Sequence, residues 1–260
     1  MSSVGSLQPG TRVALFVTCL VDLMRPQIGF AALSLLEHAG CEVVVPPDQT
    51  CCGQPAYNSG DRQAAHRLAE RVLEQLEDYD YVVVPSGSCG GMIRVHYLEL
   101  FADDPNLNQR MSRLAPRVFE LTDFLQNVAG LETVPGLAQG CVTYHDSCSG
   151  LRELGVCEQP RELLRKIPGL EIREMKQARA CCGFGGTFSL KYGNVSTAIV
   201  DEKISNIQET GAQAVVLGDL GCMLNIEGRL RRLGDDKTQV LHVAEVLSGQ
   251  LEADGLKGRR

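Results

Sequence analysis

The chain has 260 residues, of which 44% are hydrophobic and 22% charged, and its formal net charge is −7. These values are typical of a soluble globular protein with one large domain or two small ones. The acidic balance and the absence of tryptophan argue against a nucleic-acid-binding surface. The apolar run at residues 13–21 is too short to cross a bilayer, so we expect no membrane span.

Strands and helices alternate through the first half of the sequence. The expected order is strand 12–18, helix 28–39, strand 42–46, helix 61–76, strand 81–85 and a helical stretch at 106–128. Gly40 ends the first of these helices, and Ser59 or Asp61 is a candidate N-cap for the second.

A second series of the same kind follows a break at residues 130–140, where Pro135 and Gly136 stand. It comprises strand 141–145, helix 161–166, strand 170–174, helix 195–210 and strand 214–219. Alternating strands and helices imply parallel sheets built from βαβ units. The sequence therefore predicts an α/β fold with two similar Rossmann-like half-domains related by internal duplication. We expect the first domain at residues 10–133 and the second at 138–250.

Eleven cysteines are present, and eight of them fall into a repeated frame. A cysteine doublet followed by glycine occurs twice. A single cysteine precedes each doublet by 32 or 33 positions, and another follows it by 37 or 40 positions. The framed residues are Cys19, Cys51, Cys52 and Cys89 in the first half, and Cys148, Cys181, Cys182 and Cys222 in the second.

Each framed cysteine is expected just beyond the carboxyl end of a strand, at the edge where open α/β sheets bind their ligands. An odd number of cysteines without a visible secretory signal indicates metal or redox chemistry in the cytoplasm rather than structural disulfides. Thiolates suit iron–sulfur clusters, zinc or copper(I). Because no C-x-x-C knuckle is present, the pattern favours a polynuclear iron–sulfur site in each half.

Two simpler interpretations remain open for the framed cysteines. Free cysteine is often a small buried hydrophobic residue, and four thiolates also fit a structural zinc site, which one half could hold. His145 and Asp146 precede Cys148 and are candidates for side chains that orient or tune a bound metal from behind its ligands. Cys41 and Cys141 begin strands and are expected in the core, whereas Cys157 has no counterpart in the first half.

The cysteine frame, together with residues 144–155, 181–189 and 218–225, resembles the tandem cysteine-rich CCG-domain family. This family includes the CCG-containing component of heterodisulfide reductase, the glycolate oxidase iron–sulfur subunit and lactate utilization protein A, and the last of these is the nearest in pattern. In the full family motif the last cysteine belongs to a C-x-x-C pair. Here Met92 and Asn225 stand at the second position of that pair, so each half offers four thiolates.

The resemblance implies an electron-transfer subunit that carries one iron–sulfur cluster in each half. The five cysteines of the full family motif hold a noncubane cluster, whereas the four thiolates here suit a [4Fe–4S] cubane equally well, so both cluster types remain open. It implies a complex with other lactate-utilization subunits, including a ferredoxin-type iron–sulfur protein, that converts L-lactate to pyruvate. Since no flavin or nicotinamide fingerprint is present, the chain is not expected to catalyse this oxidation alone. Two rival interpretations are a thiol–disulfide reductase component like that of heterodisulfide reductase, and an assembly module stabilised by zinc.

Overall fold

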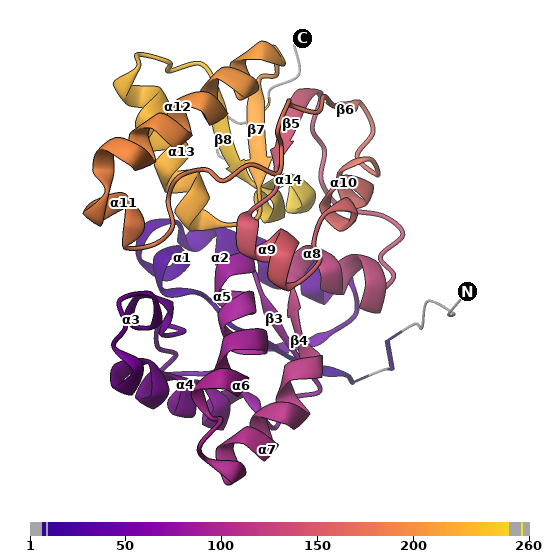
Figure 1. Ribbon diagram of the computed structural model, residues 1–260. Coiled ribbons are helices and arrows are strands. Elements are labelled where there is room, and N and C mark those ends of the chain that lie inside the picture. The colour runs from indigo at the N-terminus through magenta and orange to yellow at the C-terminus, as the bar shows by residue number, and fades with distance from the viewer. Residues whose placement is uncertain (1–6, 9, 250–255, 257–260) are drawn as a thin grey trace.

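Two four-stranded parallel sheets, one in each half of the chain, form the framework of the protein (Figure 1). The computed structural model describes residues 7–8, 10–249 and 256. The first sheet has the order β2-β1-β3-β4, with strands β1 (Arg12–Leu15), β2 (Glu42–Val44), β3 (Tyr81–Val84) and β4 (Val118–Glu120). The second has the order β6-β5-β7-β8, with strands β5 (Gly140–His145), β6 (Leu170–Ile172), β7 (Ala214–Leu217) and β8 (Gln239–His242).

The two sheets share one topology, which confirms the predicted fold class of two similar half-domains. In each sheet the first strand in sequence lies second in space, and every pairing is parallel. Leu15 pairs with Val83 in the first sheet as Tyr144 pairs with Val216 in the second. The division of the chain between residues 133 and 138 stays a prediction, and residue 250 lies outside the described residues.

Helices flank both sheets. Those of the first half are α1 (Cys19–Met24), α2 (Pro26–His38), α3 (Gln54–Asn58), α4 (Arg62–Leu76), α5 (Gly87–Gly91), α6 (Tyr97–Leu100), α7 (Pro105–Leu114) and α8 (Leu121–Asp123). The second half holds α9 (Cys148–Glu153), α10 (Glu158–Leu164), α11 (Phe188–Lys191), α12 (Gly193–Glu209), α13 (Leu220–Arg232) and α14 (Val243–Ser248). The short segments η1 (Met92–His96), η2 (Ala115–Arg117) and η3 (Phe124–Val128) complete the set. No helix among the described residues has the length and apolar character needed to cross a membrane.

The predicted helical stretch at 106–128 is wrong in its middle, because it contains β4. Pro116 in η2 separates α7 from this strand, and Val82 and Val84 of β3 pair with it. The strand has only three residues, too few to show the alternation of apolar and polar positions that identifies a strand in a sequence. The fourth strand of the second sheet, β8, was likewise not predicted.

The hydrophobic core joins the two halves. One buried cluster includes Val13 and Leu35 from the first half and Val216 and Val246 from the second, and α2 packs against α14 across the boundary. A second cluster covers the opposite face of the first sheet, beneath α4 and α7. The halves therefore form one folded unit, and burial of their shared apolar surface fixes their relative orientation.

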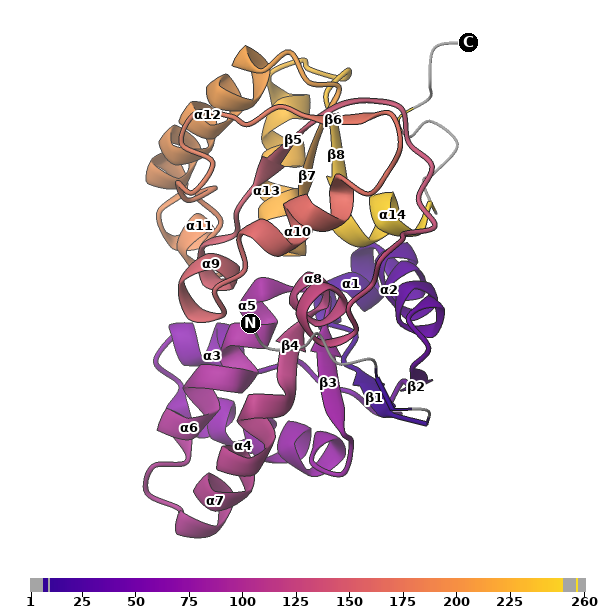
Figure 2. The ribbon, with the colours of Figure 1, turned by 90° about the vertical axis from the view of Figure 1, so that its right-hand side faces the viewer.

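The carboxyl ends of both sheets point toward the boundary between the halves (Figures 1 and 2). There α5 of the first half packs against α9 of the second. Glycines permit this close approach, because a Cβ atom at Gly87 would lie 2.7 Å from Ser147 Oγ and 2.8 Å from Gly150 Cα. The Gly87 amide also donates to the Gly218 carbonyl at 3.3 Å.

The close contact predicts that Gly87→Ala destabilises the protein by about 1–3 kcal/mol, since its methyl group would overlap the facing backbone. Gly228→Ala is the matched control. Nothing lies within 4 Å of a Cβ atom at Gly228 in α13, so alanine there is expected to stabilise the helix by about 0.5–1 kcal/mol. Urea unfolding measures both changes. Equal stability of the two variants would contradict the packing assigned to α5.

Candidate metal centres at the strand ends

The four framed cysteines of the first half lie together (the first site, defined as Cys19, Cys51, Cys52 and Cys89). Cys19 opens α1 after β1, the doublet lies between β2 and α3, and Cys89 lies in α5 after β3. Cys51 Sγ interacts with both Cys19 and Cys52. The Sγ atoms of Cys52 and Cys89 are 3.4 Å apart.

The second half repeats this arrangement (the second site, defined as Cys148, Cys181, Cys182 and Cys222). Cys148 opens α9 after β5, and Cys222 lies in the first turn of α13 after β7. Cys181 Sγ interacts with Cys148 and Cys182, and 2.9 Å separates the Sγ atoms of Cys182 and Cys222. In each sheet the site lies where the strand order reverses, which is the usual binding position of open α/β sheets.

The glycine after each doublet turns the backbone toward the sulfur atoms. Gly53 and Gly183 have φ values of +85° and +86°, which L side chains rarely adopt. In this conformation the Gly53 amide donates to Cys51 Sγ at 3.4 Å, and the Gly183 amide donates to Cys181 Sγ at 3.3 Å. A Cβ atom at Gly183 would also lie 2.7 Å from the Ser196 carbonyl oxygen. The positive φ explains why each doublet is followed by glycine, and the close contact adds a second constraint at Gly183.

Each site favours a thiolate at the first cysteine of its doublet. Hydrogen bonds from Cys19 and Cys52 lower the pKa of Cys51 to about 3, and those from Cys148 and Cys182 lower the pKa of Cys181 to about 2. Hydrogen bonding to these thiolates and burial raise the pKa values of Cys19 and Cys148. Negative charge thus gathers at both sites, which suits a bound cation or cationic cluster core.

Both sites line neighbouring hollows between the two halves. A cavity of about 290 Å³ borders the second site, and one of about 240 Å³ borders the first. Their common walls include Gln54, Ser88, Phe184 and Asp219. A larger, mainly apolar hollow of about 540 Å³ is also lined by Cys19 and Cys51 of the first site.

Asp219 links the halves within the shared wall. Its carboxylate accepts hydrogen bonds from Ser86 Oγ at 3.1 Å and from the Ser88 amide at 2.9 Å, both in the first half. It also caps α13 by accepting from the Gly221 amide at 3.1 Å. This residue therefore fixes the helix that carries Cys222 against the loop that leads to Cys89.

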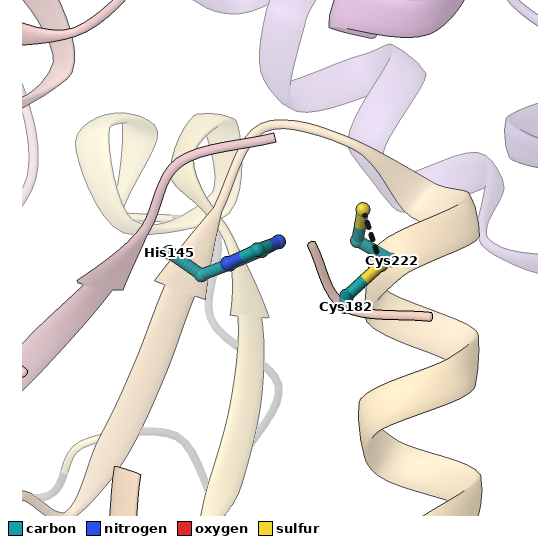
Figure 3. A group of neighbouring side chains, drawn as sticks. All are labelled: His145, Cys182 and Cys222. Atoms are coloured by element: carbon teal, nitrogen blue, oxygen red, sulfur yellow. Dashed lines mark hydrogen bonds between the residues drawn. The ribbon is translucent and has the colours of Figure 1, made fainter. Parts of the chain in front are cut away.

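His145 lies beside the second site. Its ring points toward the sulfur atoms of Cys182 and Cys222, and the three potential ligand atoms lie within 4.8 Å of one another (Figure 3). The residue is fully buried, and this burial lowers the pKa of the imidazole to about 3. His145 is therefore neutral near pH 7 and has the position expected of a residue that tunes or ligates a metal.

Asp146 makes a different contact. Both of its carboxylate oxygens accept hydrogen bonds from Arg161, at 2.7 and 3.0 Å, and Arg161 also binds Glu174 and lies over the Tyr144 ring. The Asp146 and Arg161 side chains are only 1% and 5% exposed. The ion pair anchors α10 to the end of β5. Asp146 therefore stabilises the fold beside the second site and makes its contact with Arg161, not with the cysteines.

Met92 and Asn225, which stand where the family motif has a fifth cysteine, both pack or hydrogen-bond within the protein. Met92 is fully buried in the core of the first half. Asn225 Nδ2 donates to the Cys182 carbonyl at 2.8 Å, and in the first half Tyr97 Oη donates to the Cys52 carbonyl at the same distance. Each doublet backbone is thus held by a side chain from a neighbouring helix.

The three cysteines outside the frame lie elsewhere. Cys41 is buried, as predicted, but Cys141 is only partly buried, which corrects its expected place in the core. Cys157 Sγ approaches Arg179 Nη2 at 3.3 Å and Glu158 Oε1 at 3.8 Å.

Sequence reasoning overlooked Lys203, which is 1% exposed and lies behind the second site. Its Nζ atom donates to the Gln177 and Ala178 carbonyls at 2.7 and 3.3 Å. The signal was present in the sequence, because Lys203 falls on the apolar face of α12 together with Val200 and Ile207.

The donor set fits an iron–sulfur cluster or another thiophilic metal at each site. The eleven cysteines are all free, and eight of them supply two groups of four sulfur atoms at corresponding strand ends. The second site adds the imidazole of His145 to its sulfur atoms.

Comparison with known proteins identifies the same domain twice. A family model described as a cysteine-rich domain, CCG, matches residues 13–94 and 142–227. The chain is 46% identical over 239 residues to lactate utilization protein A of Bacillus subtilis, covering 92% of this chain and 100% of that protein. It is equally similar to lactate utilization protein A of Geobacillus kaustophilus, with coverage of 92% and 99%.

The fold is also found among solved structures. A hypothetical protein from Helicobacter pylori superimposes with a TM-score of 0.66 at 14% sequence identity, over 97% of this chain and 51% of that protein. At this identity the likeness concerns the fold alone.

The buried ion pair predicts a large effect for Arg161→Leu. Removal of the guanidinium leaves the Asp146 carboxylate buried without a counter-charge, which costs about 3–5 kcal/mol of unfolding free energy. Arg173→Leu is the control, because the Arg173–Glu171 pair is exposed and its loss is expected to leave the denaturation midpoint nearly unchanged. A small loss in Arg161→Leu would show that the pair does not anchor α10.

Proposed function

The chain belongs to the lactate utilization protein A family, and from this premise we propose that it is the iron–sulfur electron-transfer subunit of a complex that oxidises L-lactate to pyruvate. The observation that carries the proposal is the pair of four-sulfur groups, one at the carboxyl end of each sheet. Four cysteine thiolates are a usual ligand set of a [4Fe–4S] cluster, and the chain presents this set twice, beside neighbouring cavities.

In this proposal the first site and the second site each hold one iron–sulfur cluster of [4Fe–4S] type. Such a cluster, when bound, accepts and releases single electrons. The residues of the chain hold it in place: the cysteines supply thiolates, and the Gly53 and Gly183 amides donate to sulfur. The shared wall of Ser88, Phe184 and Asp219 keeps the two sites adjacent.

The oxidation of lactate removes two electrons and needs a partner that binds the substrate. The proposed partners are the other lactate-utilization subunits, among them a ferredoxin-type iron–sulfur protein, in the cytoplasm. This assignment rests on the family and on the absence of a flavin or nicotinamide fingerprint in the sequence.

A second candidate concerns the second site alone. The ligand atoms of His145, Cys182 and Cys222 lie within 4.8 Å of one another, which is a spacing that a single zinc ion could bridge. Zinc there would stabilise the second half, and only the first site would carry electrons. Metal analysis separates the two candidates, because the first requires iron and acid-labile sulfide at both sites.

We predict that Cys52→Ala and Cys182→Ala each lose one cluster and retain the other. Each variant removes a buried cysteine sulfur that contacts two others of its group, and it leaves the other group intact. Iron and acid-labile sulfide per chain should fall to about half in anaerobically purified protein, and the EPR signal of one reduced cluster should disappear.

Cys157→Ser is the matched control, since its sulfur contacts Arg179 and Glu158 instead of either group. It should keep the full iron and sulfide content. Unchanged iron in both alanine variants, or loss of iron in Cys157→Ser, would contradict the assignment of ligands.

A further inference from the structure

The duplication allows the two sites to be compared position by position. Phe16 and His145 both stand three residues before the first cysteine of their site. His145 is the last residue of β5, and Phe16 directly follows the last residue of β1. The helices behind the doublets also correspond. A Cβ atom at Gly53 would contact Ala65 and Leu68, and one at Gly183 would contact Ser196 and Ile199.

These contacts align α4 with α12 at an offset of 131 residues. Lys203 in the second half therefore corresponds to Val72 in the first. At both aligned positions an apolar residue of the first half is replaced by a nitrogen-bearing side chain in the second.

The first site is backed by an apolar wall. Phe16 and Val72 are fully buried and belong to the same hydrophobic cluster as Cys52. Cys51 and Cys89 pack against this cluster from its edge. No charge from these two backing residues reaches the sulfur atoms.

The second site is backed by a buried cation and an imidazole. Lys203 has its hydrogen bonds to the backbone carbonyls of Gln177 and Ala178 rather than to a carboxylate, so its charge is not cancelled by these partners. Burial lowers the pKa of the Lys203 ammonium group, and the nearby negative charges oppose this shift. These charges are Cys182, Asp146, Cys181 and Cys222, and Asp146 is itself paired with Arg161. In a medium of low polarity such a charge acts strongly over several ångströms.

Other features of the two sites are nearly matched. Each site receives one glycine amide on sulfur, and each lines a cavity of similar volume. Asp219 borders both cavities, but its negative charge acts on Cys148 and Cys222 and opposes the addition of an electron at the second site. Arg161 neutralises Asp146. Cys222 is more buried than Cys89, which opposes the addition of an electron at the second site.

We propose that Lys203 and His145 are positioning residues that make a cluster in the second site more readily reduced than a cluster in the first. The potential of an iron–sulfur cluster depends on net charge, on hydrogen bonds to sulfur and on exposure to solvent. A buried cation offsets the negative charge that reduction adds. The inference rests on the proposed function, because it requires a cluster at each site.

The order of the two potentials is measured with single-cluster proteins. Cys52→Ala retains the second site, and Cys182→Ala retains the first. Anaerobic redox titration followed by EPR should give the higher midpoint potential for Cys52→Ala. We expect at least a tenfold difference in the reduction equilibrium, which is about 59 mV for one electron. This measurement leaves Lys203 and His145 unchanged and therefore does not depend on the folding of their variants.

Lys203→Met in the Cys52→Ala background then isolates the effect of the cation. The reduction equilibrium constant should fall at least tenfold, which lowers the midpoint potential by about 59 mV or more. The iron and sulfide content should stay constant. Lys176→Met is the matched control. Lys176 is a lysine of the same half, but it is 78% exposed and paired with Glu209. Solvent screens its charge, so its removal should leave the potential unchanged. His145→Phe introduces the residue found in the first half and removes the polar imidazole beside Cys182 and Cys222. It should also lower the midpoint potential.

The metal analysis and the redox titrations distinguish a failure of this inference from a failure of the proposed function. Absence of iron from both sites would overturn both. Zinc in the second site with iron in the first would overturn the inference and leave a one-cluster electron carrier. Two iron–sulfur clusters of equal potential, a lower potential at the second site, or equal effects of Lys203→Met and Lys176→Met would overturn the inference alone.

Discussion

The close contact between α5 and α9 is the constraint on which the paired sites depend. Gly87 faces Gly150 across the boundary, and any side chain at Gly87 would force the two helices apart. Cys89 lies in α5 and Cys148 opens α9, so this contact brings the first site and the second site to neighbouring cavities. Asp219 then holds the arrangement with hydrogen bonds from Ser86 and Ser88.

Duplication has kept the ligand frame and changed its surroundings. Both halves retain a cysteine after the first strand, a doublet followed by a left-handed glycine, and a cysteine after the third strand. Behind these positions the first half is apolar, with Phe16 and Val72. The second is polar, with His145 and Lys203. Two copies of one scaffold can therefore present similar ligands in different electrostatic environments, which is a direct way to give two clusters different potentials.

Much of this could be predicted from the sequence, because the strong signals were local or repeated. The two cysteine frames predicted which sulfur atoms would meet, and Asp61, one of the two candidate caps, caps α4. The strand β4 was missed because its three residues are too few to show an alternation of apolar and polar positions. The pairing of Asp146 with Arg161 was missed because it depends on how α10 packs, and the contact of α5 with α9 because it joins residues far apart in the chain.

Anomalous X-ray diffraction from crystals of anaerobically purified protein, recorded on both sides of the iron absorption edge, tests the central claim most directly. The account predicts two separate iron peaks, one among Cys19, Cys51, Cys52 and Cys89 and one among Cys148, Cys181, Cys182 and Cys222. The account would be contradicted if neither group of cysteines showed an iron peak and the sulfur atoms were free or joined in disulfides.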